Sequence, residues 1–376
     1  MKKILFFIES LAGGGAEKVL TTILQNIDKS KYDITVLTVV NTGVYVSEVE
    51  ECCRLITMLP EYESVSTPVE RMLYKIRYKF IYNASAELVY RRFIHEKYDV
   101  EIAFVEGFAT KIIAASPNKK SKKICWLHSD MINNPYADCF YSSLKQEQEI
   151  YRQYDSIVAV SKSVKKAFEQ KFGHINKVEV VYNPIDSVKI EEKATETIQI
   201  EKTCGLQIIS IGRLVKQKGY DRLISALASP RNINLAYNMM ILGEGPERPV
   251  LEEMIQQKQL AAKIHLLGFQ KNPYPWIRYS DVFVCSSRAE GYSLVIAEAI
   301  ALGKPIISVD CAGPNELLDY GKCGVLIDNT DSQLEETIHL LLTNRIDLKK
   351  YSLLSKKQRN RFGIEDTMTK LDRILQ

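Results

Sequence analysis

Two glutamates, Glu290 and Glu298, stand eight residues apart in the segment SSRAEGYSLVIAEAIALGKPII. Carboxylates accept hydrogen bonds from neighbouring hydroxyl pairs, such as those of sugars and ribose. The pattern predicts a strand, a short loop and a helix, with Glu290 at the mouth of the helix and Glu298 two turns inside it. The helix start would bind an anion through its backbone N–H groups, which we assign to Gly291, Tyr292, Ser293 and Leu294. Both acids also have structural interpretations: Glu290 could be a capping acid and Glu298 a surface acid, although a carboxylate among apolar neighbours needs a partner.

Two cations, Arg213 and Lys218, lie five residues apart in GRLVKQKGYDRLI, before a helix expected to begin near Tyr220. A forked guanidinium and a point-charge ammonium converging at a helix start suit a diphosphate better than a single carboxylate. They could equally be solvated surface charges, and position alone leaves both interpretations open.

A glycine-rich loop, SLAGGGAEK, contains Gly14 and Gly15 and follows the first expected strand, where backbone could approach a ligand. A dinucleotide fingerprint would need a third glycine where Lys18 stands, so that fingerprint is absent. A plain tight turn is the alternative.

Two further turns, LGEGPERPVLE with Gly243 and LLGFQKN with Leu267 and Gly268, follow later strands. Either alone could be a simple connection. Their recurrence at successive strand ends argues for one shared crevice.

The elements that must position these residues alternate between short apolar runs and helical patterns, which is typical of parallel α/β sheets with crossover helices. The first half predicts strands at Lys2–Ile8, Ile34–Val40, Val100–Glu106, Lys122–His128, Ser156–Ser161 and Val178–Asn183. The second half predicts strands at Leu206–Gly212, Asn238–Gly243, Lys263–Gly268, Val282–Ser287, Pro305–Asp310 and Gly324–Asp328. We expect a domain linker at 183–201 and only helix after Ser332. In doubly wound sheets ligands bind beyond the carboxyl ends of strands, where the motifs above stand.

Length and composition agree with two domains, because 376 residues exceed what one core usually fills. The chain is 46% hydrophobic and 26% charged, as in soluble globular proteins, and no segment approaches the roughly 20 uncharged apolar residues of a membrane span. We interpret MKKILFFIES as a buried strand rather than a signal peptide, because Glu9 ends a short apolar run. The eight cysteines contain no C-x-x-C pair, so reduced cytosolic thiols are expected.

The stretch 71–97 contains seven basic residues against two acids, interleaved with aromatic and aliphatic side chains. Cations attract anionic headgroups while apolar groups insert shallowly, so the stretch is interpreted as a contact for an inner-leaflet membrane surface. The alternative is a solvated amphipathic helix with its aromatics facing the core. No nucleic-acid-binding signature accompanies it, so nucleic acid is not an expected partner.

Seven segments in order resemble the retaining, bacterial GT-B glycosyltransferases of family four: GGGAEK, VAVSKSVKK, YNPID, GRLVKQKGYDRLI, GEGPERPVLE, HLLGF and EGYSLVIAEAIALGKPII. They span nearly the whole chain and are densest from Leu206 to Asp328. The resemblance implies two facing Rossmann-like domains with a deep cleft between them. Residues 1–188, with a C-terminal helix at about 360–376, would bind the acceptor, and residues 189–359 the nucleotide sugar.

The resemblance also implies roles for single residues. Arg213 and Lys218 match the pair on the donor diphosphate, Glu298 an acid on the ribose, and Glu290 an acid beside the transferred sugar. His128 matches a histidine near the acceptor and the donor phosphate, although a lone strand-end histidine could merely pack. The remaining donor-binding matches are Gly14, Gly15, Gly243, Leu267, Gly268, Gly291, Tyr292, Ser293 and Leu294.

The implied activity is retaining transfer of a hexose or N-acetylhexosamine from a UDP-sugar to a lipid-linked or glycan acceptor. No Asp-x-Asp pair occurs, so no metal or other cofactor is expected, and Arg213 and Lys218 would offset the leaving diphosphate. The form DCAGPNE at 310–316 suggests a capsule or other surface-polysaccharide pathway, and the enzyme is expected in the cytoplasm, peripheral to the cytoplasmic membrane. Alternatives are a UDP-sugar-modifying enzyme such as an epimerase, a phosphorylase, a nicotinamide-dependent oxidoreductase, and a non-catalytic partner subunit.

Overall fold

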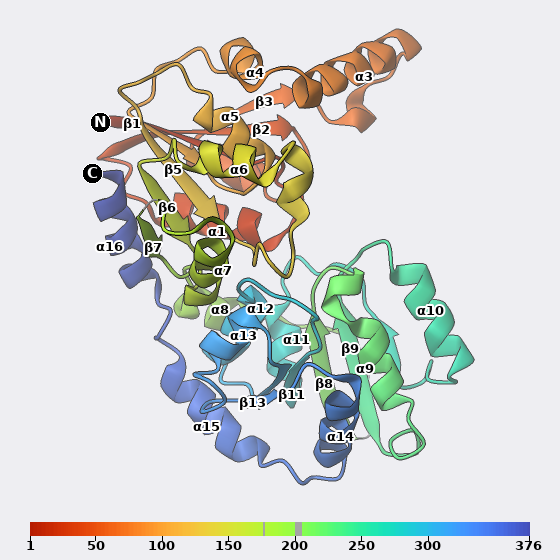
Figure 1. The fold of residues 1–376 in the computed structure, drawn as a ribbon. Helices are drawn as coiled ribbons and strands as arrows, with labels where there is room; N and C mark the ends of the chain where they lie inside the picture. The colour runs from red at the N-terminus through yellow and green to blue at the C-terminus, as the bar shows by residue number, and fades with distance from the viewer. Residues whose placement is uncertain (176, 200–204) are drawn as a thin grey trace. The chain divides into compact units, whose positions relative to one another are not determined.

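The computed structural model describes residues 1–175, 177–199 and 205–376. It divides into two compact units, of which unit 1 comprises Met1–Pro184 with Glu365–Gln376 and unit 2 comprises Ile185–Ile364. Each unit is a parallel sheet with helices on its faces (Figure 1).

Unit 1 contains, within its described residues, a parallel sheet in the order β3-β2-β1-β4-β5-β6-β7. Its strands are β1 (Lys2–Phe7), β2 (Tyr32–Val40), β3 (Arg54–Leu59), β4 (Val100–Ala103), β5 (Lys122–Leu127), β6 (Ser156–Ala159) and β7 (Val178–Val180). Its helices, with short 3₁₀ segments marked η, are α1 (Gly15–Asn26), α2 (Val46–Cys52), η1 (Tyr62–Ser64), α3 (Pro68–Asn83), α4 (Ala86–Phe93), α5 (Phe108–Ala114), η2 (Tyr136–Phe140), α6 (Leu144–Tyr151), α7 (Lys162–Phe172) and α16 (Ile364–Leu375). The strand order reverses between β1 and β4, and a doubly wound sheet binds ligands at the carboxyl ends of such a pair.

Unit 2 repeats this topology, with the order β10-β9-β8-β11-β12-β13 in its described residues. Its strands are β8 (Leu206–Ile211), β9 (Tyr237–Leu242), β10 (Ile264–Leu266), β11 (Val282–Cys285), β12 (Ile306–Val309) and β13 (Val325–Ile327). Its helices are α8 (Ser187–Lys193), η3 (Lys216–Lys218), α9 (Tyr220–Leu227), α10 (Arg248–Gln257), α11 (Tyr274–Tyr279), α12 (Leu294–Ala301), α13 (Ala312–Leu317), α14 (Asp331–Leu342) and α15 (Leu348–Gln358). Here the order reverses between β8 and β11, which is the corresponding place for a ligand.

The central strands are buried on both faces, and this explains their continuous apolar runs. In β1, Ile4, Leu5, Phe6 and Phe7 are each at most 1% exposed. The edge strand β3 was not predicted, because its sequence RLITML is only partly buried and lacks such a run. Several strands also end earlier than predicted: β4 stops at Ala103, and the residues beyond it leave the ladder to form the loop that carries Glu106.

The stretch 183–201 was predicted to be a linker, but it contains α8, a helix that packs within unit 2. Asp186 caps this helix by accepting a hydrogen bond from the Lys189 backbone N–H at 3.0 Å. Glu191 on α8 forms ion pairs with Arg278 and Arg359. The helix escaped prediction because its seven residues are too few to show a clear period. Residues 200 and 201 of the predicted linker lie outside the described residues.

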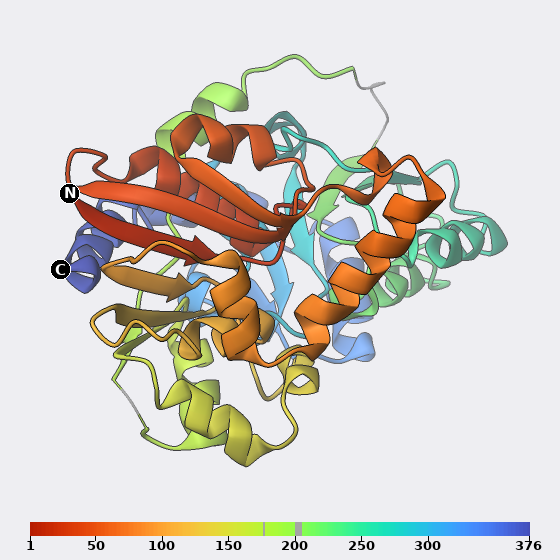
Figure 2. The same ribbon diagram turned by 90° about the horizontal axis from the view of Figure 1, so that it is seen from above.

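The last helix, α16, packs in unit 1 although unit 2 precedes it in the chain (Figures 1 and 2). Tyr32 donates a hydrogen bond to Asp372 at 2.6 Å, and Lys2 donates to the Leu375 carbonyl at 3.2 Å. Leu371, Ile374 and Leu375 are buried. The last residues of the chain, which follow unit 2, therefore complete the core of unit 1.

Candidate functional site

Three glycines mark the carboxyl ends of adjacent strands in unit 2: Gly212 after β8, Gly243 after β9 and Gly268 after β10. The Gly243 N–H donates to the Gly268 carbonyl at 2.8 Å. A Cβ on Gly243, which has a φ of +139°, would lie 2.0 Å from the Gly212 carbonyl oxygen. No larger residue fits there, because the loops after β8 and β9 approach each other closely. Leu267, also predicted here, is tied to β9 by its N–H, which donates to Ile241 at 2.9 Å.

Lys218 and Glu290 meet at the point where the strand order of unit 2 reverses. The Lys218 ammonium lies 2.5 Å from Glu290 Oε1, and the Ser287 hydroxyl donates to the same oxygen at 2.8 Å. The two charged side chains are 20% and 8% exposed. Burial acts to lower the pKa of Lys218, but the Glu290 carboxylate outweighs it and the pKa is raised. Lys218 therefore stays a cation at neutral pH.

The loops that carry these two residues are joined by contacts that the sequence analysis missed. Arg288 holds Asp221 with two hydrogen bonds of 2.8 and 2.9 Å and donates to the Lys216 carbonyl at 2.8 Å. Gln217 donates to the Ala289 carbonyl at 2.8 Å. The Arg and Asp lie 67 residues apart, and no local pattern marks them as partners.

Arg213 is exposed, immediately beyond β8, and no described residue forms an ion pair with it. The two predicted cations lie near one another, because the positive charge of Arg213 acts to lower the pKa of Lys218. The helix expected near Tyr220 does begin there, as α9. Gly219 precedes it with a φ of +67°, and a Cβ there would lie 2.2 Å from the Ser286 carbonyl oxygen. This close approach brings the Lys218 turn against the end of β11.

Glu290 was predicted at the mouth of the helix and Glu298 two turns inside it, but the helix begins later than predicted. Helix α12 begins only at Leu294, with Ser293 as its cap, so Glu290 stands in the loop before it and Glu298 one turn inside. Gly291 and Tyr292 belong to this loop, which α13 covers: a Cβ on Gly313 would lie 2.7 Å from the Cα of Tyr292. Helix α13 therefore packs directly against the backbone of this loop.

Glu298 is 2% exposed and accepts a hydrogen bond from the Tyr274 hydroxyl at 3.1 Å. It is not the surface acid of the alternative interpretation. Tyr274 is a further residue that the sequence analysis missed, because it lies on α11, 24 positions from Glu298.

The remaining predicted residues lie in unit 1. Gly14 caps α1 and Gly15 is its first residue. His128 follows β5, and burial lowers its pKa to about 3, so the imidazole is neutral. Its ring packs 5.1 Å from that of Phe104. The structure thus groups eleven predicted residues in unit 2 and three in unit 1: Arg213, Lys218, Gly243, Leu267, Gly268, Glu290, Gly291, Tyr292, Ser293, Leu294 and Glu298, with Gly14, Gly15 and His128.

Comparison with known proteins covers both units. Residues 13–189 match Glycosyltransferase Family 4, and residues 194–361 match Glycosyl transferases group 1. The solved structure of Anabaena HepE in complex with UDP-glucose has a TM-score of 0.74 and 19% identity, covering 100% of this chain and 99% of that one. This chain belongs to the GT-B glycosyltransferases. The S. aureus TarM structure, with a TM-score of 0.72 at 14% identity over the full length of both chains, shares the fold.

Among curated relatives of this glycosyltransferase is a Campylobacter jejuni protein, N-acetylgalactosamine-N,N'-diacetylbacillosaminyl-diphospho-undecaprenol 4-alpha-N-acetylgalactosaminyltransferase. It is 28% identical over 345 residues, which cover 89% of either chain. An uncharacterised glycosyltransferase of Methanocaldococcus jannaschii is 31% identical over 237 residues, 57% of this chain and 58% of the relative. The match to the archaeal relative therefore spans little more than half of that protein's length.

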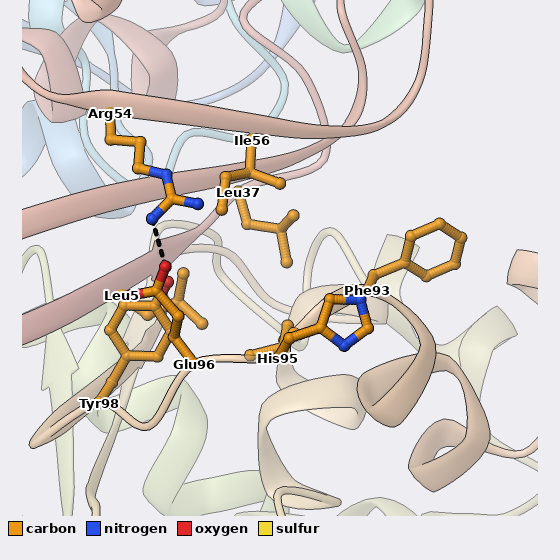
Figure 3. Close-up of a pocket in the computed structure, with 9 residues that line it drawn as sticks. Leu5, Leu37, Arg54, Ile56, Phe93, His95, Glu96 and Tyr98 are labelled. Atoms are coloured by element: carbon orange, nitrogen blue, oxygen red, sulfur yellow. Dashed lines mark hydrogen bonds and ion pairs between the residues drawn. The ribbon is translucent and has the colours of Figure 1, made fainter.

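A pocket of about 170 Å³ in unit 1 of the glycosyltransferase is separate from the predicted site residues (Figure 3). It opens on one face of β1, β2 and β3 and is lined mainly by apolar side chains, with an Arg54–Glu96 ion pair at its rim. None of the predicted donor-binding or catalytic residues lines it, although Phe93, Ile94, His95 and Glu96 belong to the stretch 71–97. It lies beside the middle of the strands rather than at their carboxyl ends, so it is not the crevice that the topology predicts.

No helix in the described ranges combines the length and the apolar character that crossing a bilayer demands.

Proposed function

We propose that this glycosyltransferase moves a hexose or N-acetylhexosamine from a UDP-sugar to a lipid-linked or glycan acceptor in bacterial surface-polysaccharide synthesis. The observation that carries the proposal is the Lys218–Glu290 pair of 2.5 Å at the reversal point of unit 2. A cation held at that point by a carboxylate suits a ligand that combines a diphosphate with a sugar.

The surrounding residues support a nucleotide sugar in particular. Arg213 adds a second cation near Lys218, and the strand-end glycines let a ligand approach the backbone. Glu298, oriented by Tyr274, offers a carboxylate for ribose hydroxyls. The HepE neighbour is in complex with UDP-glucose, and the C. jejuni relative is named for an undecaprenol diphosphate acceptor.

In the proposed retaining reaction, the bond between the anomeric carbon and the diphosphate oxygen breaks on the face where the acceptor oxygen bonds. The departing phosphate takes the proton of the acceptor hydroxyl, so atoms and charge balance. Lys218 and Arg213 would stabilise the negative charge on the leaving diphosphate in the role a metal could otherwise fill. Glu290 would orient the transferred sugar, with Lys218 as its fixed partner.

The test begins with a panel of UDP- and GDP-sugars, scored by thermal stabilisation and by slow hydrolysis. Glu290→Gln keeps the side-chain volume and a hydrogen-bond acceptor, whereas Ala would leave a buried ammonium, which costs roughly 3–5 kcal/mol. We expect turnover of the stabilising sugar nucleotide to fall by roughly 100-fold or more in Glu290→Gln, because the carboxylate acts at the reacting sugar. Glu252→Gln, on the exposed outer side of α10, is the matched control.

Turnover near the wild-type value in Glu290→Gln would show that this residue is not at the reacting sugar. Mass analysis of products from UDP-sugar alone separates transfer from the rival chemistry, since an isomerised UDP-sugar would indicate an epimerase. Stabilisation by no sugar nucleotide at all would contradict the proposal as a whole.

We also propose that the enzyme is cytoplasmic and works at the surface of the cytoplasmic membrane, where a lipid-linked acceptor lies. Helix α3 stands out from the rest of unit 1 (Figure 1). It carries exposed aliphatic and aromatic side chains. Its outer row follows the spacing of one helix face: Val69, Met72, Leu73, Ile76 and Phe80, which are 69%, 66%, 48%, 53% and 38% exposed.

Basic residues flank this outer row, and they are exposed as well: Arg71, Lys75, Arg77 and Lys79. An apolar row bordered by cations complements an anionic lipid surface. The tyrosines of the helix lie on its other face, where Tyr78 is still 43% exposed. Tyr74, Tyr78 and Tyr82 form a row of ring contacts that ends on Phe108, with centroids 6.4, 4.8 and 4.6 Å apart. The inserting groups would thus be mainly the aliphatic residues of the outer row, whereas the sequence analysis assigned the aromatic and aliphatic side chains of the stretch alike to the membrane.

A further inference from the structure

We infer that Glu106 is the residue that positions His128 in unit 1. The inference rests on the proposed function for the assignment of His128 to the reaction. Glu106 follows β4 at the reversal point of the unit 1 sheet, beside the end of β1. Unlike His128, it was not singled out from the sequence.

One buried carboxylate holds two loops together here. Glu106 is 0% exposed, and its Oε1 accepts the backbone N–H groups of His128 and Ser129, each at 2.6 Å. The Tyr136 hydroxyl donates to Oε2 at 3.0 Å. Burial raises the pKa of Glu106, and the hydrogen bonds that it accepts act in the opposite direction. The backbone at His128 is thereby fixed from the neighbouring strand end.

The fixed backbone determines what the His128 ring can do. The Nε2 atom of the ring is buried and has no hydrogen-bond partner among the described residues. Burial lowers the pKa of His128 to about 3, so the ring is neutral and one of its two nitrogens carries a lone pair. His128 can accept a hydrogen bond from a hydroxyl group, such as one on a sugar. It does not present a positive charge to a phosphate.

Tyr136 and Glu9 extend the same arrangement. Burial raises the pKa of Tyr136, and the charges of Glu106 and Glu9 raise it further, so the two carboxylates lie near this hydroxyl. Glu9 stands just beyond β1 and accepts a hydrogen bond from Tyr82 at 3.1 Å. Groups from β1, β4 and β5 therefore converge at the end of the unit 1 sheet, with Glu106 as the one that contacts the His128 backbone.

A glutamate within β4 provides a matched control. Glu101 is also 0% exposed and also accepts a tyrosine hydroxyl, that of Tyr90 at 3.0 Å. It lies five residues before Glu106, near the amino end of the strand, and bonds to no residue of the 128–136 loop. A purely structural role would make Glu101→Gln and Glu106→Gln equivalent.

The experiment uses the full chain labelled with ¹⁵N-histidine, in which five residues give signals. His128 is assigned by its loss in His128→Gln. We expect the His128 amide proton to move upfield in Glu106→Gln, because a neutral acceptor replaces a carboxylate, while the other four histidine amides stay in place. Glu101→Gln should leave the His128 signal unchanged.

Activity supplies the second readout, as hydrolysis of the sugar nucleotide that most stabilises the protein in the panel above. Glu106→Ala should lower kcat by roughly tenfold or more with KM for the donor little changed, because misplacement of a group near the reacting atoms costs rate. Glu106→Gln, which can still accept the two N–H groups, should recover part of that loss. Glu101→Gln should keep wild-type kcat.

An unmoved His128 amide in Glu106→Gln, or equal effects of the Glu101 and Glu106 variants, would overturn the inference. The labelling readout needs no substrate, so it decides the positioning role even if every sugar nucleotide fails. Failure of turnover in the wild type would count against the proposed function alone.

Discussion

At the scale of single residues, the strand-end loops of the two units differ in the charge of their side chains. In unit 2 a buried ammonium is paired with a carboxylate, so Lys218 remains charged. In unit 1 burial removes the charge from His128. A charged pair suits a diphosphate sugar, and a neutral imidazole suits a hydroxyl.

The neutral His128 should make stability depend on pH. Burial lowers its pKa in the folded protein to about 3, from an ordinary value of 6.5, so below pH 6.5 the unfolded chain binds a proton that the folded protein does not. The stabilisation is complete above pH 6.5 and is lost as pH falls towards 3, at up to about 1.4 kcal/mol per pH unit. His128→Phe, which keeps a ring beside Phe104, should lose less stability than the wild type over this range.

Urea unfolding followed by tryptophan fluorescence at pH 7, 6 and 5 measures the difference between the two proteins. Other acids titrate in the same range in both, so only the gap between wild type and variant is compared. Parallel pH curves would show that the folded histidine protonates as freely as the unfolded one.

At the scale of elements, the two faces of helix α3 have different surroundings. The capping box of Thr67 and Glu70 starts the helix, with Pro68 in its first turn. Ile81 is 0% exposed and, with the tyrosine row, anchors the inner side. The aliphatic row is left outward, where apolar side chains of a soluble protein are normally few.

This helix should bind anionic vesicles. We expect Leu73→Glu with Ile76→Glu to lower cosedimentation with vesicles of phosphatidylglycerol and phosphatidylcholine by roughly tenfold or more, because both apolar contact and charge attraction are lost. Lys75→Gln with Lys79→Gln should weaken binding similarly, since each lysine near the surface contributes about 1 kcal/mol.

Leu353→Glu, at a residue of α15 that is 61% exposed, is the control and should bind as the wild type does. Vesicles of phosphatidylcholine alone should bind weakly. Unchanged binding in both α3 double variants would remove α3 as the membrane contact.

At the scale of the whole molecule, unit 1 depends on the last residues of the chain. Leu375 is 0% exposed in α16, and Arg373 pairs with Glu179 at 2.7 Å on the same unit. Figures 1 and 2 both place α16 beside the sheet of unit 1. A substitution in α16 should therefore change the stability of unit 1, whose first residue lies more than 350 positions earlier in the chain.

The two tryptophans allow this to be measured, since Trp126 lies in unit 1 and Trp276 in unit 2. In a Trp276→Phe background, Leu375→Ala should destabilise the transition seen by Trp126 by roughly 2–5 kcal/mol, as buried Leu→Ala changes do. Leu341→Ala, a buried change on α14, should instead move the transition of unit 2 in a Trp126→Phe background. A Trp126 transition that Leu375→Ala leaves unmoved would contradict the packing of α16 in unit 1.

Local sequence patterns predicted much of the fold and many residues of the candidate site. Buried strands need continuous apolar runs, so twelve of the strands were found near their observed places, and strand-end motifs pointed to Lys218, Arg213, Glu290 and Glu298. Elements with a weak sequence pattern were not predicted. β3 lies half-exposed at a sheet edge, and α8 is too short for its period to show.

Only the tertiary structure decided which residues meet. The pairing of Lys218 with Glu290 spans 72 positions, and Glu106 reaches the His128 backbone across 22. Whether the tyrosines or the aliphatic residues of α3 face outward likewise depends on what packs beneath the helix. Apolar periodicity is a property of neighbouring residues and survives in the sequence. Hydrogen bonds and ion pairs between distant loops arise only when the sheet brings its strand ends together.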